Sequence, residues 1–186
     1  MSSYSAADGG IRIDIWDSHS PAATHQDIES LAEVLQACVQ AGASVSFVLP
    51  FSLEDGKAFW VDQILPGVHA GGRCLLMARA GERIVGTVQL DLATPPNQPH
   101  RAEVRKLLVA PGFRRQGVAR ALMLAAEAEA GRRGRSLLTL DTVTGGAAEA
   151  LYRSLGYRVT GVIPDYAWNY DSTVLESTTV MYKTLL

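Results

Sequence analysis

The junction "VRKLLVAPGFRRQGVARALMLAAEAEA" (residues 104–130) constrains the fold of this chain more than any other segment. It passes from an apolar strand pattern, through Pro, Gly and Arg residues, into apolar positions spaced three and four apart, as on one face of a helix. A helix that begins here presents unpaired backbone amides and the positive end of its dipole beside Arg114, Arg115 and Arg120. Such a junction is a general anion site, and a phosphate or pyrophosphate fits it.

Two well-known phosphate loops do not match this junction. Gly112 and Gly117 have the spacing of a nucleoside triphosphate loop, but Val118 and Ala119 stand where that motif requires Lys and then Ser or Thr. The dinucleotide fingerprint Gly-x-Gly-x-x-Gly occurs at no strand-to-helix turn. Taken alone, the loop is equally compatible with an ordinary helix start carrying solvated arginines.

The remaining pattern predicts a mixed α/β class for one domain at residues 11–186, after a flexible N-terminus at 1–10. Its 186 residues and 47% hydrophobic content are enough for one sizeable core. We expect a central mixed, mostly antiparallel sheet flanked by about four helices, with a long functional loop at 164–177. The expected strands are 11–16, 73–80, 83–92, 102–109, 137–143, 157–163 and 178–185, and the expected helices are 27–42, 53–65, 117–130 and 147–155.

The strand 103–109 has an imperfect alternation. Glu103 and Arg105 share parity with apolar Leu107, while Lys106 shares it with apolar Leu108. A β-bulge explains such a change of parity and splays the fourth expected strand from the fifth, at 137–143.

Composition excludes several partner classes. Lys and Arg total 17 against 19 acidic residues, so no global positive field favours nucleic acid. No stretch approaches the roughly 20 apolar residues that span a bilayer, and the N-terminus lacks a signal-peptide pattern, so we expect a cytoplasmic protein without a membrane partner. Cys38 and Cys74 are expected to be buried free thiols, and no Cys or His spacing predicts a metal.

Two segments resemble the GNAT superfamily of N-acetyltransferases. "VAPGFRRQGVA" (109–119) is similar to its acyl-CoA pyrophosphate motif, and "AAEALYRSLGY" (147–157) is similar to its next helix. The resemblance implies an acyl-CoA-binding core at about 102–160, acetyl-CoA as cosubstrate, no metal, and direct transfer to an amine in a ternary complex. The cofactor-binding residues it implies are Leu107, Leu108, Val109, Arg114, Arg115, Gln116, Gly117, Val118, Ala119 and Arg120.

Acetyl transfer to an amine requires a base, because an alkyl ammonium with a pKa near 10 must first lose its proton. Glu103 matches the place where some members of the superfamily carry a glutamate that acts through water; the alternative is a solvated carboxylate paired with Arg101 or Arg105. Asp141 is the rival, since it ends an apolar strand, and its alternative role is to cap the following loop.

The reaction also requires a donor for the carbonyl oxygen and a proton for the departing thiolate. A backbone amide within Leu107 to Val109 is the expected oxyanion donor. Tyr152 matches the tyrosine that the superfamily places near the CoA sulfur; from its helical spacing alone it is a core aromatic residue.

The acceptor pocket is the least determined part of the site. Phe47, Asp165 and Trp168 are candidate substrate-binding residues, two as walls and the aspartate as a partner for a cation. Several segments also resemble a superfamily member that acetylates a toxic amino-acid analogue, which implies a small amine substrate and a role in toxin or antibiotic resistance. Acetylation of protein N-termini or lysines, a non-catalytic acyl-CoA sensor, and a homodimer stay open.

Overall fold

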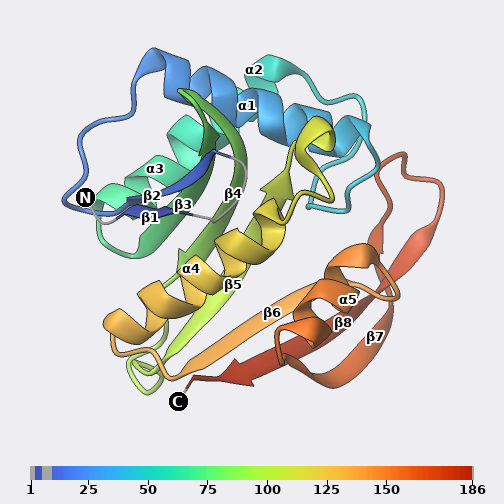
Figure 1. Ribbon diagram of the computed structural model, residues 1–186. Coiled ribbons are helices and arrows are strands. Elements are labelled where there is room, and N and C mark those ends of the chain that lie inside the picture. Colours follow the sequence, from blue (N-terminus) through green and yellow to red (C-terminus); the bar gives the residue numbers. More distant parts are fainter. Residues whose placement is uncertain (1–2, 6–9, 186) are drawn as a thin grey trace.

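The computed structural model describes the backbone at residues 3–5 and the whole chain at 10–185. Figure 1 shows one twisted sheet with helices on both faces. Of the N-terminus predicted to be flexible, residues 1–2 and 6–9 lie outside the described part, and Ser3–Ser5 pairs with the next strand. Described strands follow the order β1-β2-β3-β4-β5-β6-β8-β7. They are β1 (Ser3–Ser5), β2 (Ile11–Trp16), β3 (Arg73–Ala80), β4 (Arg83–Asp91), β5 (Arg101–Val109), β6 (Leu137–Val143), β7 (Arg158–Trp168) and β8 (Leu175–Thr184).

Every neighbouring pair of these strands is antiparallel except β5 and β6, which run parallel. The prediction of a mixed, mostly antiparallel sheet in one α/β domain is therefore confirmed. The helical segments are α1 (His25–Gln40), α2 (Leu53–Ala58), the π-helix η1 (Phe59–Ile64), α3 (Leu65–His69), the short 3-10 turn η2 (Pro111–Phe113), α4 (Val118–Arg132) and α5 (Ala147–Ser154).

Two apolar cores lie on opposite faces of the sheet. One joins the sheet to α4 and α5, and the other joins it to α1, α2, η1 and α3. Helix α1 begins where Thr24 and Asp27 form a capping box, with each side chain accepting a hydrogen bond from the other residue's backbone N–H. The helices packed on both faces therefore fix the positions of the central strands.

The second helix is longer than predicted. The sequence predicts that it stops at Pro66 and Gly67, but α2, η1 and α3 follow one another without a break to His69. This prediction is wrong because the π-helical bonding of η1 ends with the bond from Leu65 N–H to the Trp60 carbonyl, and Pro66 falls in the first turn of α3, where proline is tolerated.

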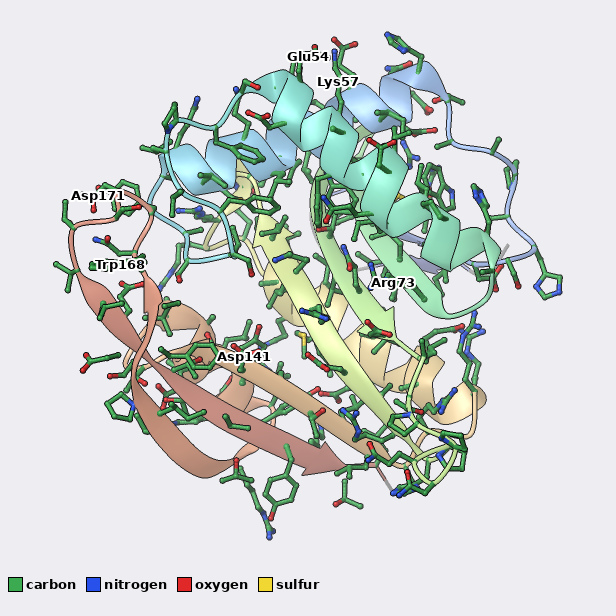
Figure 2. The ribbon with its side chains drawn as sticks, turned by 180° about the vertical axis from the view of Figure 1, so that it is seen from behind. Glu54, Lys57, Arg73, Asp141, Trp168 and Asp171 are labelled. Atoms are coloured by element: carbon green, nitrogen blue, oxygen red, sulfur yellow. The ribbon has the colours of Figure 1, made fainter. Side chains whose placement is uncertain are left out.

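The segment 164–177 is not the long loop that the sequence predicts. Strand β7 continues to Trp168 and β8 begins at Leu175, so the connection is residues 169–174. A register shift between Ile163 and Ala167, with Asp165 at φ +49°, breaks the alternating pattern and conceals the strand in the sequence. Figure 2 shows Trp168 and Asp171 at the outer end of this hairpin.

The predicted bulge in β5 is confirmed. Thr87 of β4 pairs with Leu108 and Gln89 pairs with Arg105, so Lys106 and its successor lie opposite a single residue. Lys106 has φ +50°, which turns the strand at this point. Strands β5 and β6 pair only through residues 101–103 and 137–139 and then separate, as Figure 1 shows.

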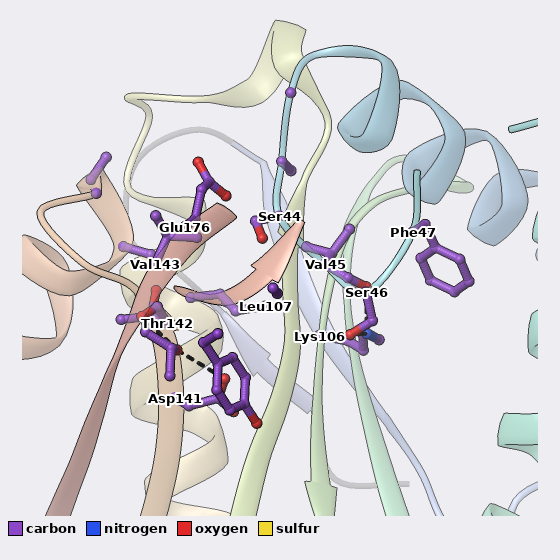
Figure 3. A pocket seen from close by; sticks show the side chains of 18 of the residues that line it. Ser44, Val45, Ser46, Phe47, Lys106, Leu107, Asp141, Thr142, Val143 and Glu176 are labelled. Atoms are coloured by element: carbon purple, nitrogen blue, oxygen red, sulfur yellow. Dashed lines mark hydrogen bonds between the residues drawn. The ribbon is translucent and has the colours of Figure 1, made fainter. Parts of the chain in front are cut away.

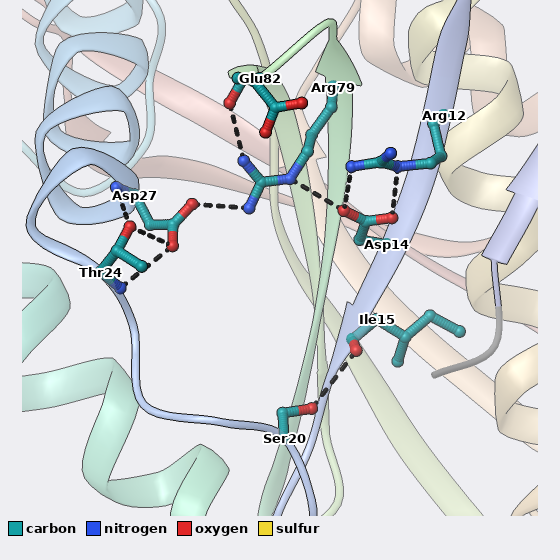
Figure 4. Close-up of polar contacts among 8 residues, drawn as sticks. All are labelled: Arg12, Asp14, Ile15, Ser20, Thr24, Asp27, Arg79 and Glu82. Carbon is teal, nitrogen blue, oxygen red and sulfur yellow. Dashed lines mark hydrogen bonds and ion pairs between the residues drawn. The ribbon is translucent and has the colours of Figure 1, made fainter.

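A buried ion-pair network ties the N-terminal strands to α1. Arg79 donates from Nε to Asp14 at 2.8 Å, from a terminal nitrogen to Asp27 at 2.6 Å, and from the other to the carbonyl of Glu82 at 2.8 Å (Figure 4). Arg12 adds a second partner for Asp14 at 2.9 Å. Since all three guanidinium nitrogens of Arg79 donate hydrogen bonds within the chain, this network is a structural support that joins β2 and β3 to α1.

Candidate active site

A cavity of about 730 Å³ lies where β5 and β6 separate. Its walls come from residues 41–48, the bulge of β5, the end of β6, the start of α5 and the β7–β8 hairpin (Figure 3). Six of the candidate residues predicted from the sequence line it: Phe47, Leu107, Arg114, Asp141, Tyr152 and Trp168.

The loop before α4 leaves the first amides of that helix without partners. Gly117, at φ +80°, is the N-cap, has no side chain to cap the helix, and faces open space where a Cβ would stand. The first helical backbone bond is donated by Ala121 to the Gly117 carbonyl at 3.0 Å, so the amides between them are available to an anion. Buried Val118 fixes the helix end on the core.

The polar side chains of this loop have individual partners. Arg114 donates from Nε to the carbonyl of Val109 at 3.2 Å, and Gln116 donates to the carbonyl of Gly112 at 3.0 Å. Arg120 donates to Ser154 Oγ at 2.7 Å and thereby links α4 to α5. Arg114 lines the cavity, whereas the other side chains of this paragraph do not.

Three more predicted cofactor residues have different surroundings. Leu107 is half-buried and lines the cavity, and the bulge leaves it without a register partner on β4. Leu108 is 2% exposed in the core beneath α1, so only its backbone is available. Arg115 is exposed and has φ +63°, a conformation that shapes the loop before Gly117.

Tyr152 reaches the cavity from α5 while its ring is buried, with the ring of Tyr157 5.7 Å away between centroids. In the described chain its hydroxyl makes no hydrogen bond. Burial raises the pKa of Tyr152 above that of an ordinary phenol, and the nearby charge of Asp141 raises it further. The group therefore stays protonated near neutral pH and is able to donate a hydrogen bond into the cavity.

The two candidate bases have different positions. Asp141 is exposed at the end of β6, lines the cavity, and accepts a hydrogen bond from Thr178 Oγ1 at 3.3 Å. Glu103 lies in the part of β5 that is paired with β6, outside the cavity lining. Its carboxylate is 3.9 Å from Arg101 and 3.7 Å from Arg105, which is the paired arrangement that the sequence left open.

The acceptor side of the cavity is partly as predicted. Phe47 lines it and packs on Phe51, with ring centroids 4.8 Å apart, and Trp168 of the hairpin lines it with its side chain half exposed. Asp165 lies on the same hairpin but does not line the cavity, so the structure does not bring it to the other candidates.

Sequence reasoning missed Lys106 and Glu176, which both line the cavity. Lys106 Nζ donates to the carbonyl of Val45 at 2.6 Å and contacts Ser46 Oγ at 3.1 Å, above the ring of Phe47. Burial lowers the pKa of Lys106 to about 8. The sequence carried a signal for Lys106, because this residue interrupts the alternation of its strand. Glu176 carried none, because it lies in a segment that the sequence predicts to be a loop.

Other features of the site concern metals, thiols and membranes. Over the described ranges, no group of three or more His, Cys, Asp or Glu side chains is placed to hold a metal ion. Cys38 and Cys74 are buried free thiols, as predicted. In the same part of the chain, no helix combines the length and the apolarity that crossing a membrane requires.

The chain belongs to the acetyltransferase (GNAT) family, whose model matches residues 30–157. It is similar to human N-acetyltransferase 8, with 37% identity over 92 residues, 48% of this chain and 40% of that protein. It is also similar to an uncharacterized N-acetyltransferase in the hisH-hisA intergenic region of Azospirillum brasilense, with 31% identity over 117 residues, 62% of this chain and 67% of that protein. The chain thus matches two fifths of the length of the human relative and two thirds of the bacterial one.

The fold is shared with solved structures of the family. The structure of yncA, a putative acetyltransferase of Salmonella typhimurium with its cofactor acetyl-CoA, superposes with a TM-score of 0.72 at 18% identity, covering 96% of this chain and 95% of that one. The chain therefore has both the sequence signature and the fold of the acetyltransferase (GNAT) family.

Proposed function

We propose that the protein transfers the acetyl group of acetyl-CoA to the primary amine of a small molecule, by direct attack in a ternary complex. The observation that carries this proposal is that one cavity joins the splayed strands β5 and β6 to the tyrosine of α5 and to the acceptor side. Coenzyme A has a pyrophosphate for the open amides of α4 and a long arm for the space between the two strands.

The cofactor end supplies binding and electrostatic groups. The amides that follow Gly117, together with Arg114 and Arg115, bind the pyrophosphate. The amide of Leu107, left without a register partner by the bulge, is the oxyanion donor for the thioester carbonyl. No metal is needed for these roles.

The acceptor amine attacks the thioester carbon, and the C–S bond breaks as the C–N bond forms. Asp141, acting directly or through water, takes the proton that the amine nitrogen loses, while Glu103 is the alternative base. Tyr152 donates a hydrogen bond to the departing sulfur, which leaves as the thiolate of CoA and takes up a proton. Each role lies with a named group of this chain.

A small, amino-acid-like acceptor is favoured by the shape of the site and by resemblance. Residues 42–49 connect to the hairpin, since the amide of Leu49 donates to the carbonyl of Tyr170 at 2.7 Å, and together they narrow the approach. Segments such as "GASVSF" and "LDTVTGGAAEALYRSLGY" resemble the tabtoxin resistance acetyltransferase. We therefore extend the proposal to an amino-acid-like toxin or antibiotic.

The experiment that tests the proposal measures thiol release from acetyl-CoA in the presence of single amines. A panel of small amines and amino-acid analogues is compared with short peptides that have free N-termini or lysines. Amine-dependent release with small compounds is expected. Release with peptides alone would indicate a protein acetyltransferase, and tight acetyl-CoA binding without any release would indicate a sensor.

A further inference from the structure

The charged side chains that line the cavity are unequally paired. Each of the three cations has a partner within the chain. Lys106 donates hydrogen bonds to residues 45 and 46, and Arg114 donates to the carbonyl of Val109. Arg105 lies 3.7 Å from the carboxylate of Glu103 and 3.8 Å from that of Asp91. The two acids, Asp141 and Glu176, have no ion pair within the described chain, and Asp141 has only the hydroxyl of Thr178. Lys106 and Arg114 keep their positive charge in these hydrogen bonds, so the two acids are distinguished not by a negative net charge of the lining but by having no ion-pair partner among the described residues.

Glu176 is the most unusual of these groups. Its Oε2 atom is inaccessible to solvent and has no hydrogen-bond partner among the residues described. A carboxylate oxygen withdrawn from water without a partner is costly, and such groups in native proteins call for a ligand or another explanation. Figure 3 shows Glu176 at the end of the cavity away from Asp141.

Asp141 and Glu176 lie on one face of the C-terminal strands. Asp141 pairs with Val180 of β8, and Glu176 is four residues from Val180, so the two acids share a face and are separated by about 13 Å along the strand. Leu138 and Leu140, of opposite parity on β6, are buried in the core that contains α4 and α5. The face of the sheet that carries Asp141 and Glu176 is therefore the one opposite that core.

The wall beside Glu176 belongs to the β7–β8 hairpin. Ala167 is the register partner of Glu176, and it lines the cavity together with its neighbours Tyr166 and Trp168.

We propose that the acceptor is a dication: its reacting amine lies at Asp141 and Tyr152, and Glu176 binds a second ammonium or guanidinium group at the outer end. Only the placement of the reacting amine at Asp141 and Tyr152 rests on the proposed function. The pairing of Glu176 with a cation neutralises its carboxylate and discriminates against amines that lack a second charge.

The test compares two ligands that differ by one amine, 1,6-diaminohexane and hexylamine. Both are titrated by calorimetry into the free protein and into the protein saturated with CoA. We expect the diamine to bind at least about tenfold more tightly, and Glu176→Gln to reduce that ratio to about one while hexylamine binding stays unchanged. Asp62→Asn, which removes an exposed carboxylate outside the cavity lining, should preserve the ratio.

Equal affinity for the two ligands in the wild type, or a preference that survives Glu176→Gln, would overturn the inference. The readout does not require turnover, so it stands apart from the proposed function. A diamine preference together with no acetyl-CoA binding would support the cation site and reject acetyl transfer, whereas acetyl-CoA binding without a diamine preference would reject the cation site alone.

Discussion

The two parts of the proposed site are built in different ways. The proposed cofactor end consists mainly of backbone: the positive φ of Gly117, the open amides of α4 and the bulge at Lys106. The acceptor end consists of side chains from separate segments, among them Phe47, Asp141 and Glu176. A backbone site suits a ligand that is common to a whole family, whereas a side-chain site changes with each substitution, so we expect the acceptor end to determine the choice of substrate.

Substitution at Gly117 is expected to give the largest effect. Gly117→Glu places a side chain at φ +80° and a negative charge where the pyrophosphate binds, so acetyl-CoA affinity should fall at least about a hundredfold. Gly134→Glu is the matched control, because Gly134 also has positive φ and open surroundings but follows the other end of α4. Calorimetry that shows equal losses for both variants would refute the assigned cradle.

Removal of the Tyr152 hydroxyl should separate chemistry from cofactor binding. Tyr152→Phe is expected to lower kcat by about 10- to 100-fold with an unchanged Kd for acetyl-CoA, because the hydroxyl acts on the departing sulfur. Tyr157→Phe is the control, because it removes the hydroxyl of the neighbouring buried ring, which lies outside the cavity lining. An unchanged kcat in Tyr152→Phe would exclude its role in the reaction.

The two candidate bases are separated by neutral variants. Asp141→Asn should reduce kcat/KM by about tenfold or more. Glu103→Gln should change kcat/KM less than about threefold, because the Glu103 carboxylate lies outside the cavity lining and is paired with Arg101 and Arg105. Steady-state rates across a range of pH measure both effects. The reverse order would assign the base to Glu103 acting through water.

A smaller effect is expected at Lys106, at the bulge of β5. Its pKa of about 8 in the folded protein lies below the 10.5 of an unburied lysine, so above pH 8 the folded state binds fewer protons than the unfolded state. The free energy of unfolding should therefore rise by about 1 to 2 kcal/mol between pH 7 and about pH 9.5, discounted for partial exposure, relative to Lys106→Met. Urea unfolding at both pH values measures it, and parallel curves for the two proteins would contradict the buried amine.

The same contrast explains what the sequence could predict. The cofactor end is encoded in one continuous stretch, so its strand, bulge, loop and helix were all predictable from residues 103–130. The acceptor end depends on register: Thr178 meets Asp141 across 37 residues, and Glu176 lies in a strand whose alternation is interrupted near Asp165. Such pairings arise from tertiary packing and have no local signature.

Helix boundaries show the same limit. Pro66 is a strong local stop signal, yet the chain passes through it because the preceding π-helix places the proline in a first turn. Glu103 matched a position that the family uses for a base, but the structure surrounds it with Arg101 and Arg105. In both cases the surroundings of a residue were set by neighbours that its local sequence pattern did not reveal.

A titration of acetyl-CoA into the ¹⁵N-labelled protein, followed by amide chemical shifts, tests whether the bulge of β5 and the start of α4 bind the cofactor. The largest changes are expected at the amides of residues 107–109 and 115–119, with smaller changes at Asp141 and Tyr152. Absence of shifts at residues 115–119, or shifts concentrated around Arg79, would contradict this assignment of the cofactor site.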